Sequence, residues 1–500
     1  MKEEYPPKKS LKAQVMAGLV WRLLERISVQ LISLVVSIVL ARLLTPEEFG
    51  ITALVTVFVN IATALAENGF GNALIQKETV EEIDYSSVFY FGVCTYSGLY
   101  LLLFLTAPYI ALFYRDALLT PVIRVMGLRL IIAAFNMVQY AHVHRYLQFK
   151  KYFLSTLIGT ITSAAAAFCM AYRGFGVWAL VAQTLVSALV NMIVLWIVVG
   201  WRPKRCFSWI SLKTLLSYGW KLMAASLINT VYHELRSLII GRVYSTAALA
   251  YYTKGRSFPS LITNNVSSTI EGVLFPAMSR KQKSPNDLRT MTRRSIQVTT
   301  YFTMPLMIGL AVVARPLVLA LLTEKWIACV PFLQIICITH ALLPMLTANE
   351  QAIKALGRSG LHLKLQIIKK GIGVFLLLLS IPFGVLAVTV SGAVVSVIST
   401  VINAFPNSKL LGYGYFAQLA DIAPSVLMSA VMAAAIYPMQ YLPIASILVL
   451  ILQVISGGAI YLLLSVILKN ESFYYILHAV RQMRMSHSGE NRPNEAAAKS

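Results

Sequence analysis

Long apolar runs separated by short polar segments occupy most of the chain. Fourteen of them approach or exceed the roughly 20 residues that a helix needs to cross a bilayer. The runs lie at 17–41, 49–67, 86–113, 119–141, 153–172, 177–200, 215–239, 246–275, 295–321, 328–347, 365–382, 384–405, 421–439 and 443–468. The seventh and eighth carry internal charges, so the expected number of membrane-spanning helices is about fourteen, within a range of 12–14. The pattern predicts an all-α integral membrane protein without an extramembrane domain.

Composition excludes a soluble protein. Charged residues make up 13% of the 500 positions and hydrophobic residues 58%, whereas a soluble domain carries about 25% charged residues to cover its surface. The formal net charge of +23 would favour nucleic-acid binding in a soluble protein. Here the charges lie in loops between apolar runs and form no basic domain. We therefore expect the lipid bilayer, and no nucleic acid, as a partner.

The distribution of Lys and Arg predicts that both termini lie in the cytoplasm, because cytoplasmic loops carry an excess of these residues. The inner segments then hold most of the cations, including the basic stretch from Arg280 to Arg294. The outer loops hold only Arg42, Arg115, Arg173, Arg242, Arg315 and Lys325. An even number of helices also returns the C-terminus to the inner side.

A faint internal repeat predicts two lobes. It pairs Trp21-Arg22 and Ala41-Arg42 with Trp220-Lys221 and Gly241-Arg242, and 176–179 with 384–387. The copies lie six helices apart, an even number, which makes them parallel and related by an axis along the membrane normal. We expect six-helix lobes at 1–205 and 206–410, two extra helices at 411–470 and a cytoplasmic tail at 471–500.

Polar and charged side chains cluster on the first two predicted helices of each lobe. They recur every three or four residues, which places them on one face of each helix. A charge inside a span costs roughly 2.5–3.5 kcal/mol on insertion scales and usually faces a cavity. We expect a wet cavity between the lobes whose substrate-binding cations are Arg22, Arg26, Lys221, Arg236 and Arg256. Guanidinium groups pair bidentately with phosphate oxygens, so an anion is the expected ligand.

A second group of residues is predicted to line this cavity with polar atoms or to couple transport to an ion gradient. It comprises Glu25, Gln30, Asn60, Glu67, Asn229, Glu234, Asn264 and Glu271. The carboxylates could neutralise the cations locally. Alternatively, they could titrate and couple transport to a gradient of H⁺ or Na⁺. No metal site is expected, because His142 and His144 lack a third ligand at suitable spacing.

Simpler roles stay open for several of these residues. Arg22 and Glu25 have the i,i+3 spacing of a structural ion pair on a helix surface. Arg26 and Lys221 could extend to the cytoplasmic surface and keep their charge in water. Glu67 and Glu271 could simply be solvated side chains at helix ends. Asn60 and Asn264 could hydrogen-bond neighbouring helices.

Catalysis finds no support in the sequence. The chain has no G-x-S-x-G, no P-loop and no H-E-x-x-H, and the outer loops are too short to carry a reactive group of side chains. A membrane polymerase or ligase of lipid-linked glycans usually needs a large outer loop with catalytic Arg or His. We therefore expect no enzyme, no catalytic residue and no cofactor.

Several short segments together resemble one family of membrane transporters. They are Trp21-Arg22, Gln30, 41–50, Gly69-Phe70-Gly71, 73–77 and Arg145-x-x-Gln148-Phe149. They are similar to the polysaccharide transporter family of the multidrug/oligosaccharidyl-lipid/polysaccharide (MOP) exporter superfamily, which includes the MATE transporters. Within it, the chain looks most like the colanic-acid exporter type of lipopolysaccharide flippase. The resemblance implies a multi-pass protein of the bacterial inner membrane.

The resemblance also implies a substrate and a mechanism. Family members move undecaprenyl-diphosphate-linked sugar units to the periplasmic leaflet by alternating access. The expected function is therefore a flippase for an O-antigen, exopolysaccharide or capsule repeat unit. The alternative is a multidrug cation antiporter of the same superfamily, which would need an anionic cavity, whereas cations outnumber carboxylates here. The coupling ion, the glycan and partnership with a polysaccharide polymerase or glycosyltransferases stay open.

Overall fold

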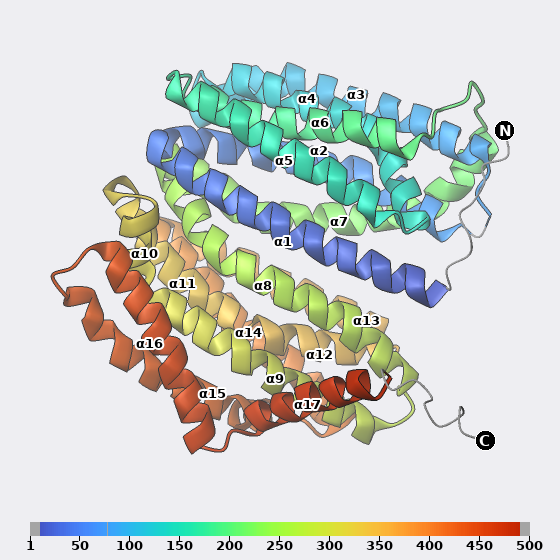
Figure 1. The fold of residues 1–500 in the computed structure, drawn as a ribbon. Helices are drawn as coiled ribbons and strands as arrows, with labels where there is room; N and C mark the ends of the chain where they lie inside the picture. The colour runs from blue at the N-terminus through green and yellow to red at the C-terminus, as the bar shows by residue number, and fades with distance from the viewer. Residues whose placement is uncertain (1–10, 78, 491–500) are drawn as a thin grey trace, which may run out of the picture. The chain divides into compact units, whose positions relative to one another are not determined.

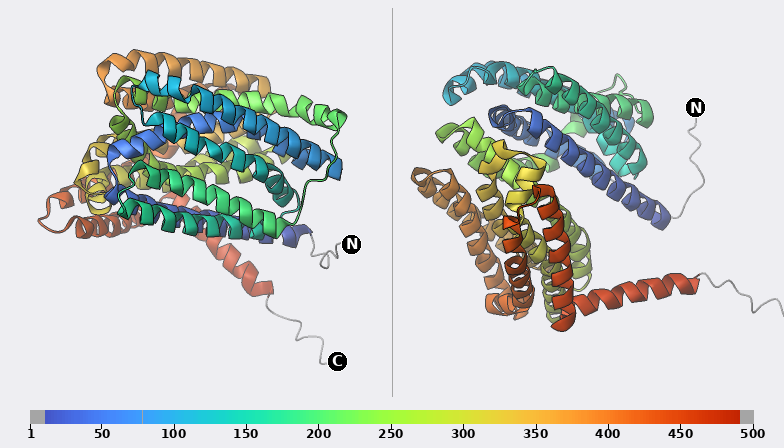
Figure 2. Two further views of the ribbon diagram at one scale, coloured as in Figure 1. Left: turned by 90° about the horizontal axis from the view of Figure 1, so that it is seen from above. Right: turned by 60° about the vertical axis from the view of Figure 1, so that its left-hand side comes forward.

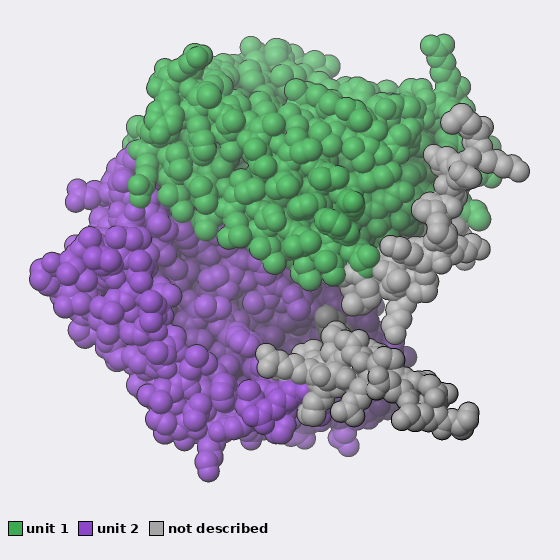
Figure 3. Space-filling view, in the orientation of Figure 1, with its two compact units in different colours: residues 1–253 green, residues 254–500 purple. Residues whose placement is uncertain are grey.

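The computed structural model describes residues 11–77 and 79–490. The chain forms two compact units that divide between Thr253 and Lys254, within α8 (Thr246–Arg280) (Figures 1 and 3). No strand occurs among the described residues, and the predicted all-α class is confirmed.

The first unit consists of seven long helices and the start of α8. They are α1 (Leu11–Leu43), α2 (Pro46–Gln76), α3 (Glu82–Tyr114), α4 (Leu119–Arg145), α5 (Phe149–Tyr172), α6 (Val177–Val199) and α7 (Trp209–Val243). Helix α5 packs on α6 and α1, α3 packs on α4, and α2 packs on α7 and α4. The α1–α5–α6 core combines Val36 and Leu40 with small residues such as Ala164 and Ala167, which let the helices approach closely.

The second unit contains the rest of α8 and the helices that follow. They are α9 (Pro285–Val312), α10 (Ala314–Leu321), η1 (Glu324–Cys329), α11 (Val330–Ala341), α12 (Leu343–Ala355), α13 (Ser359–Ser380), η2 (Ile381–Phe383), α14 (Val385–Leu411), α15 (Tyr415–Ile436), η3 (Tyr437–Tyr441), α16 (Ser446–Ile467) and α17 (Glu471–Glu490). Within this unit α15 and α16 pack on α9, where Tyr301, Met428 and Tyr461 share a buried cluster. Helix α17, in the predicted tail, leaves α16 at a steep angle (Figure 2).

Twelve helical segments of the described chain are long and apolar enough to cross a membrane. Helices α7 and α8 form where the seventh and eighth spans were predicted, and each has 35 residues. They are not among the twelve, because polar side chains interrupt them, as in the α8 segment Thr263-Asn264-Asn265. The multi-pass class is therefore confirmed, while the count of fourteen is not.

The distribution of side chains fits a lipid environment. Large apolar residues point outward, with Leu112 exposed to 78% and Phe416 to 84%. Amide side chains lie inside, where Asn349, Asn407 and Gln418 are fully buried and hydrogen-bonded to one another. Large apolar side chains outside and hydrogen-bonded amides inside are the arrangement expected when the surrounding solvent is hydrocarbon.

The contacts place α7 in the first unit. It packs mainly on α2 and also on α3, so the two compact units divide after Thr253 and not between 205 and 206. The expected lobes at 1–205 and 206–410 came from the repeat in the sequence, and they stay a prediction.

Candidate functional site: a cationic cavity in the first unit

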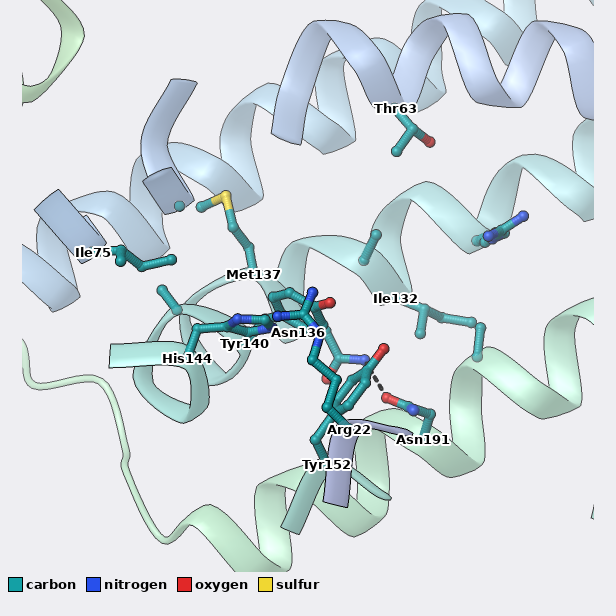
Figure 4. A pocket seen from close by; sticks show the side chains of 15 residues that line it. Arg22, Thr63, Ile75, Ile132, Asn136, Met137, Tyr140, His144, Tyr152 and Asn191 are labelled. Carbon is teal, nitrogen blue, oxygen red and sulfur yellow. Dashed lines mark hydrogen bonds between the residues drawn. The ribbon is translucent and has the colours of Figure 1, made fainter. Parts of the chain in front are cut away.

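The first unit encloses a cavity of about 670 Å³. Five helices contribute to its wall, namely α1, α2, α4, α5 and α6. The lining residues are Arg22, Thr63, Gly71, Ile75, Arg129, Ile132, Ala133, Asn136, Met137, Tyr140, Ala141, His144, Tyr152, Ala188 and Asn191. Figure 4 shows Arg22, Asn136 and Tyr152 converging on one space from three different helices.

The charges on this wall are positive. Arg22 and Arg129 line the cavity, and none of its lining residues is an Asp or Glu. The Arg22 guanidinium lies 5.6 Å from the centre of the Phe149 ring, a cation–π contact that holds it without neutralising it. No ion pair to Arg22 or Arg129 is present in the described part of the chain. The nearest carboxylate to Arg22 along α1 is Glu25, which acts on both Arg22 and Arg26.

Aromatic rings and amides form the rest of the polar wall. Tyr140 stacks on His144 with ring centres 4.4 Å apart and meets Tyr152 edge-on at 5.1 Å. The Asn136 Nδ2 group donates to Asn191 Oδ1 across 3.3 Å. Asn136 Oδ1 and His144 Nε2 are buried without a hydrogen-bond partner among the described residues. Buried polar atoms normally have partners, so these two are positions where a ligand can bind.

A second, smaller pocket of about 340 Å³ lies between α2 and α7. Its lining comprises Asn60, Thr63, Ala64, Asn229, Thr230, His233 and Glu234. Asn60 Nδ2 donates to Glu234 Oε1 at 3.0 Å. Thr63 lines both this pocket and the larger cavity, so the two spaces adjoin.

The predicted site residues of the first unit fall into three groups. Arg22 lines the larger cavity, and the smaller pocket brings together Asn60, Asn229 and Glu234. Four predicted residues are half-buried and line neither the cavity nor the smaller pocket, namely Glu25, Arg26, Gln30 and Arg236. The side chains of Glu67 and Lys221 lie outside the described residues.

The remaining predicted residues belong to the second unit. Arg256 is half-buried and acts electrostatically on His340, whose Nδ1 atom is 2.7 Å from Thr263 Oγ1. Asn264 and Glu271 are exposed. A cavity shared by the two lobes stays a prediction.

The wall that α4 provides was not among the predicted site residues, because the prediction concentrated on the first two helices of each lobe. Arg129, Asn136, Tyr140 and His144 recur at intervals of seven, four and four residues. This spacing is one face of a helix. The signal was present, but it was diluted by the alanine, isoleucine and methionine residues between these positions.

The segment 41–50, which carries much of the family resemblance, builds the start of α2. Thr45 and Glu48 form a capping box, with Thr45 N donating to Glu48 Oε2 at 2.8 Å and Glu48 N donating to Thr45 Oγ1 at 3.4 Å. Gly50 lies against the first residue of α8, where a Cβ atom would come within 1.9 Å of the Thr246 carbonyl oxygen. These residues determine helix geometry and do not face the cavity.

Arg145, another residue of the resemblance, closes the other end of α2. Its Nη1 group donates to the carbonyl oxygens of Leu74, Ile75 and Lys77 at 2.9, 3.3 and 2.6 Å. Basic groups that bind the last carbonyls of a helix stabilise its end. The role of Arg145 is therefore structural.

Comparisons with solved structures define the fold. The lipid II flippase MurJ in an inward closed conformation matches 92% of this chain and 99% of its own at 15% identity, with a TM-score of 0.72. A multidrug resistance MATE family transporter of the MOP superfamily, in an inward-facing conformation, matches 76% of this chain and 95% of its own at 15% identity, with a TM-score of 0.56. The protein is thus a multi-pass membrane protein with the fold of the MOP transporters.

Comparisons of sequence give the family. The chain belongs to the polysaccharide biosynthesis protein family, whose model matches residues 39–331. The succinoglycan biosynthesis transport protein ExoT of Rhizobium meliloti (strain 1021) is 26% identical over 68% of each chain. The lipopolysaccharide biosynthesis protein WzxC of Escherichia coli (strain K12) is 24% identical over 81% of this chain and 83% of its own. The resemblance drawn from the sequence is confirmed.

Proposed function

We propose that the chain is a flippase for polyprenyl-diphosphate-linked oligosaccharides of the bacterial inner membrane. The observation that carries this proposal is a cavity with two arginines and no carboxylate in its lining, within a fold shared with a lipid II flippase. The relatives named for succinoglycan transport and for lipopolysaccharide biosynthesis support a glycan as the cargo. Transport, and not catalysis, is the activity.

The arginines bind the diphosphate. A guanidinium offers a planar pair of donors that matches two phosphate oxygens, and Arg22 and Arg129 approach the same cavity from α1 and α4. A cavity of about 670 Å³ is within the roughly 300–1,000 Å³ typical of small-ligand sites. It holds the diphosphate and the nearest sugars, while the prenyl chain stays in lipid.

The aromatic and amide wall binds the sugars. Tyr140 and Tyr152 line the cavity with aromatic surface on which the C–H groups of a pyranose ring can pack, and the open Asn136 Oδ1 accepts from a hydroxyl group. In the adjoining pocket Asn60, Asn229 and Glu234 offer further hydroxyl partners. Alternating access then exposes this region to each side of the membrane in turn, with both termini in the cytoplasm.

The cation-antiporter alternative is disfavoured by the same geometry. An organic cation needs carboxylates or aromatic faces free of nearby positive charge. The larger cavity instead places two guanidinium groups on its wall. The single carboxylate of the smaller pocket, Glu234, is hydrogen-bonded to Asn60. The proposal also includes diphosphate-binding roles for Arg26, Lys221, Arg236 and Arg256. It further includes a polymerase or glycosyltransferases as partner proteins.

Placing a carboxylate in the cavity tests the proposal. We expect Asn136→Asp to reduce surface polysaccharide at least about tenfold, since a charge placed against a phosphate costs a few kcal/mol. The new carboxylate would also pair with the arginines and compete with the diphosphate. Surface polysaccharide is measured at matched expression in cells that depend on this chain, together with the lipid-linked repeat units that accumulate.

Asn136→Ala is the matched control. It removes the same hydrogen bond to Asn191 but adds no charge, so its effect should be several times smaller. Equal export by the two variants would contradict an anion-binding cavity.

A further inference from the structure

The second unit contains a buried charged cluster that lies outside the residues discussed so far. Glu350 of α12, Lys369 of α13 and Asn403 of α14 meet there. Lys369 Nζ donates to Glu350 Oε1 at 2.6 Å, and Gln366 Nε2 and Asn403 Nδ2 donate to the same oxygen at 3.1 and 3.2 Å. The side chain of Lys369 is 9% exposed and that of Glu350 is 21% exposed.

Stability alone does not account for this ion pair. Replacing a buried pair by apolar residues is often neutral or stabilising, because desolvation offsets the attraction. Ionisable residues within membrane helices usually belong to ion or proton pathways. The desolvation cost of burying Glu350 and Lys369 is accounted for if the pairing of these two groups changes during function.

The geometry leaves one carboxylate oxygen open. All three donors converge on Oε1, and within the described residues no donor reaches Oε2. Glu350 also keeps part of its surface accessible. A proton can therefore bind at Oε2 without first displacing another group.

Asn403 offers a second position for the ammonium group. This residue is fully buried, and its Oδ1 atom has no hydrogen-bond partner among the described residues. An unsatisfied buried acceptor costs about 1–3 kcal/mol. Its own Nδ2 group contacts Glu350 Oε1, as Lys369 Nζ does. The ammonium thus has an occupied acceptor on Glu350 and an empty one nearby on Asn403.

Other titratable groups act on the cluster. His362 of α13 acts on Glu350, and Lys354 and Lys369 act on His362. Lys370 adjoins Lys369 and feels its charge. The helices α9 and α11 also pack on α12, and from their described residues no hydrogen bond or ion pair reaches Glu350.

We propose that Glu350 and Lys369 form a proton-exchange site. A proton binds Glu350 Oε2 and neutralises the carboxylate, and Lys369 Nζ then leaves Oε1 for Asn403 Oδ1; loss of the proton reverses both steps. The ammonium of Lys369 already supplies a positive charge at Glu350 Oε1, so the ligand is a proton and not a metal ion. The exchange changes how α12, α13 and α14 are joined. It does not depend on the proposed cargo.

Infrared difference spectroscopy tests this directly, without any substrate. The full chain is reconstituted in vesicles of phosphatidylethanolamine and phosphatidylglycerol and stepped between alkaline and acidic buffer. We expect a protonated-carboxyl band that Glu350→Gln removes and Glu324→Gln, a change at an exposed carboxylate of η1, leaves in place. Lys369→Met should bring the band out at less acidic pH, because the cation that favours the ionised form is gone.

Two further arms separate the alternatives. The variant E350Q/K369M buries no unpaired charge, so it should fold and also lack the band, which covers the case in which E350Q alone is unstable. A static ion pair predicts that wild type and E350Q/K369M give the same spectrum, and that result would overturn the proposal. A band that responds to added NaCl at constant pH would overturn the choice of a proton.

Discussion

Replacing both Arg22 and Arg129 with alanine is expected to abolish polysaccharide export while leaving the protein folded. Both guanidinium groups line the cavity, and no carboxylate lines it with them. A hydrogen bond to a charged group contributes about 1.5–3 kcal/mol, which corresponds to roughly 10- to 100-fold in binding for each arginine. Export per molecule of protein, measured as surface polysaccharide at matched expression, should fall by at least the larger of these factors.

Arg124→Ala is the matched control for this experiment. Arg124 lies on the same helix as Arg129, but its guanidinium packs on the Phe104 ring at 4.2 Å and does not line the cavity. It should export normally. Lysine at positions 22 and 129 should restore part of the activity, because it keeps the charge and loses the bidentate geometry. Normal export by R22A/R129A would remove the cavity from the mechanism.

Gly50→Ala is expected to destabilise the fold strongly. An added Cβ would lie 1.9 Å from the Thr246 carbonyl oxygen and 2.4 Å from its carbonyl carbon. Both atoms belong to the backbone, so α2 would have to separate from the start of α8. We expect a loss of about 3 kcal/mol, at the upper end of the cost of overpacking. The measurement is the thermal unfolding midpoint in detergent, together with the yield of monodisperse protein.

Gly98→Ala is its control, since a Cβ at Gly98 of α3 has nothing within 4 Å. A helix-interior alanine is intrinsically more favourable than glycine by roughly 0.5–1 kcal/mol. Gly98→Ala should therefore unfold at the same or a slightly higher temperature. Equal unfolding midpoints for the two variants would show that the α2–α8 approach is not as close as described.

The sequence was informative about the fold because lipid imposes a strong pattern on it. Runs of apolar residues predicted the helices, and α7 and α8 formed even where charges such as Arg236 and Lys254 interrupted the runs. The same charges kept these helices out of the twelve apolar spans. Helix breaks were harder to predict. The predicted ninth run, 295–321, is divided into α9 and α10, and the only local signal was Pro316, three residues after Val313.

The candidate site was only partly predictable. A charge within an apolar run indicated Arg22, and amide side chains at helical spacing indicated Asn60 and Asn229. Both patterns are local features of the sequence. The wall on α4 depends on which face of that helix turns toward α1 and α5, and that is a tertiary property. Tyr140 and Tyr152 carry no charge, so nothing in the sequence distinguished them from lipid-facing aromatics.

Some of the residues that carried the family resemblance proved to be structural, whereas Arg22, which also carried it, lines the cavity. Thr45 and Glu48 cap α2, and Arg145 closes its other end. Motif likeness therefore indicated the fold and the family, but it did not distinguish Arg22 from the structural residues. Most of the other cavity residues could be identified only from the tertiary structure.

Binding of undecaprenyl diphosphate to the reconstituted protein tests the central claim most directly. The account predicts that wild type binds undecaprenyl diphosphate saturably and that undecaprenyl monophosphate and phosphatidylglycerol are weak competitors. The affinity of R22A/R129A for undecaprenyl diphosphate should be lower by at least about 100-fold. Arg124→Ala should bind like wild type. Equal binding by wild type and R22A/R129A, or no preference for the diphosphate, would contradict the account.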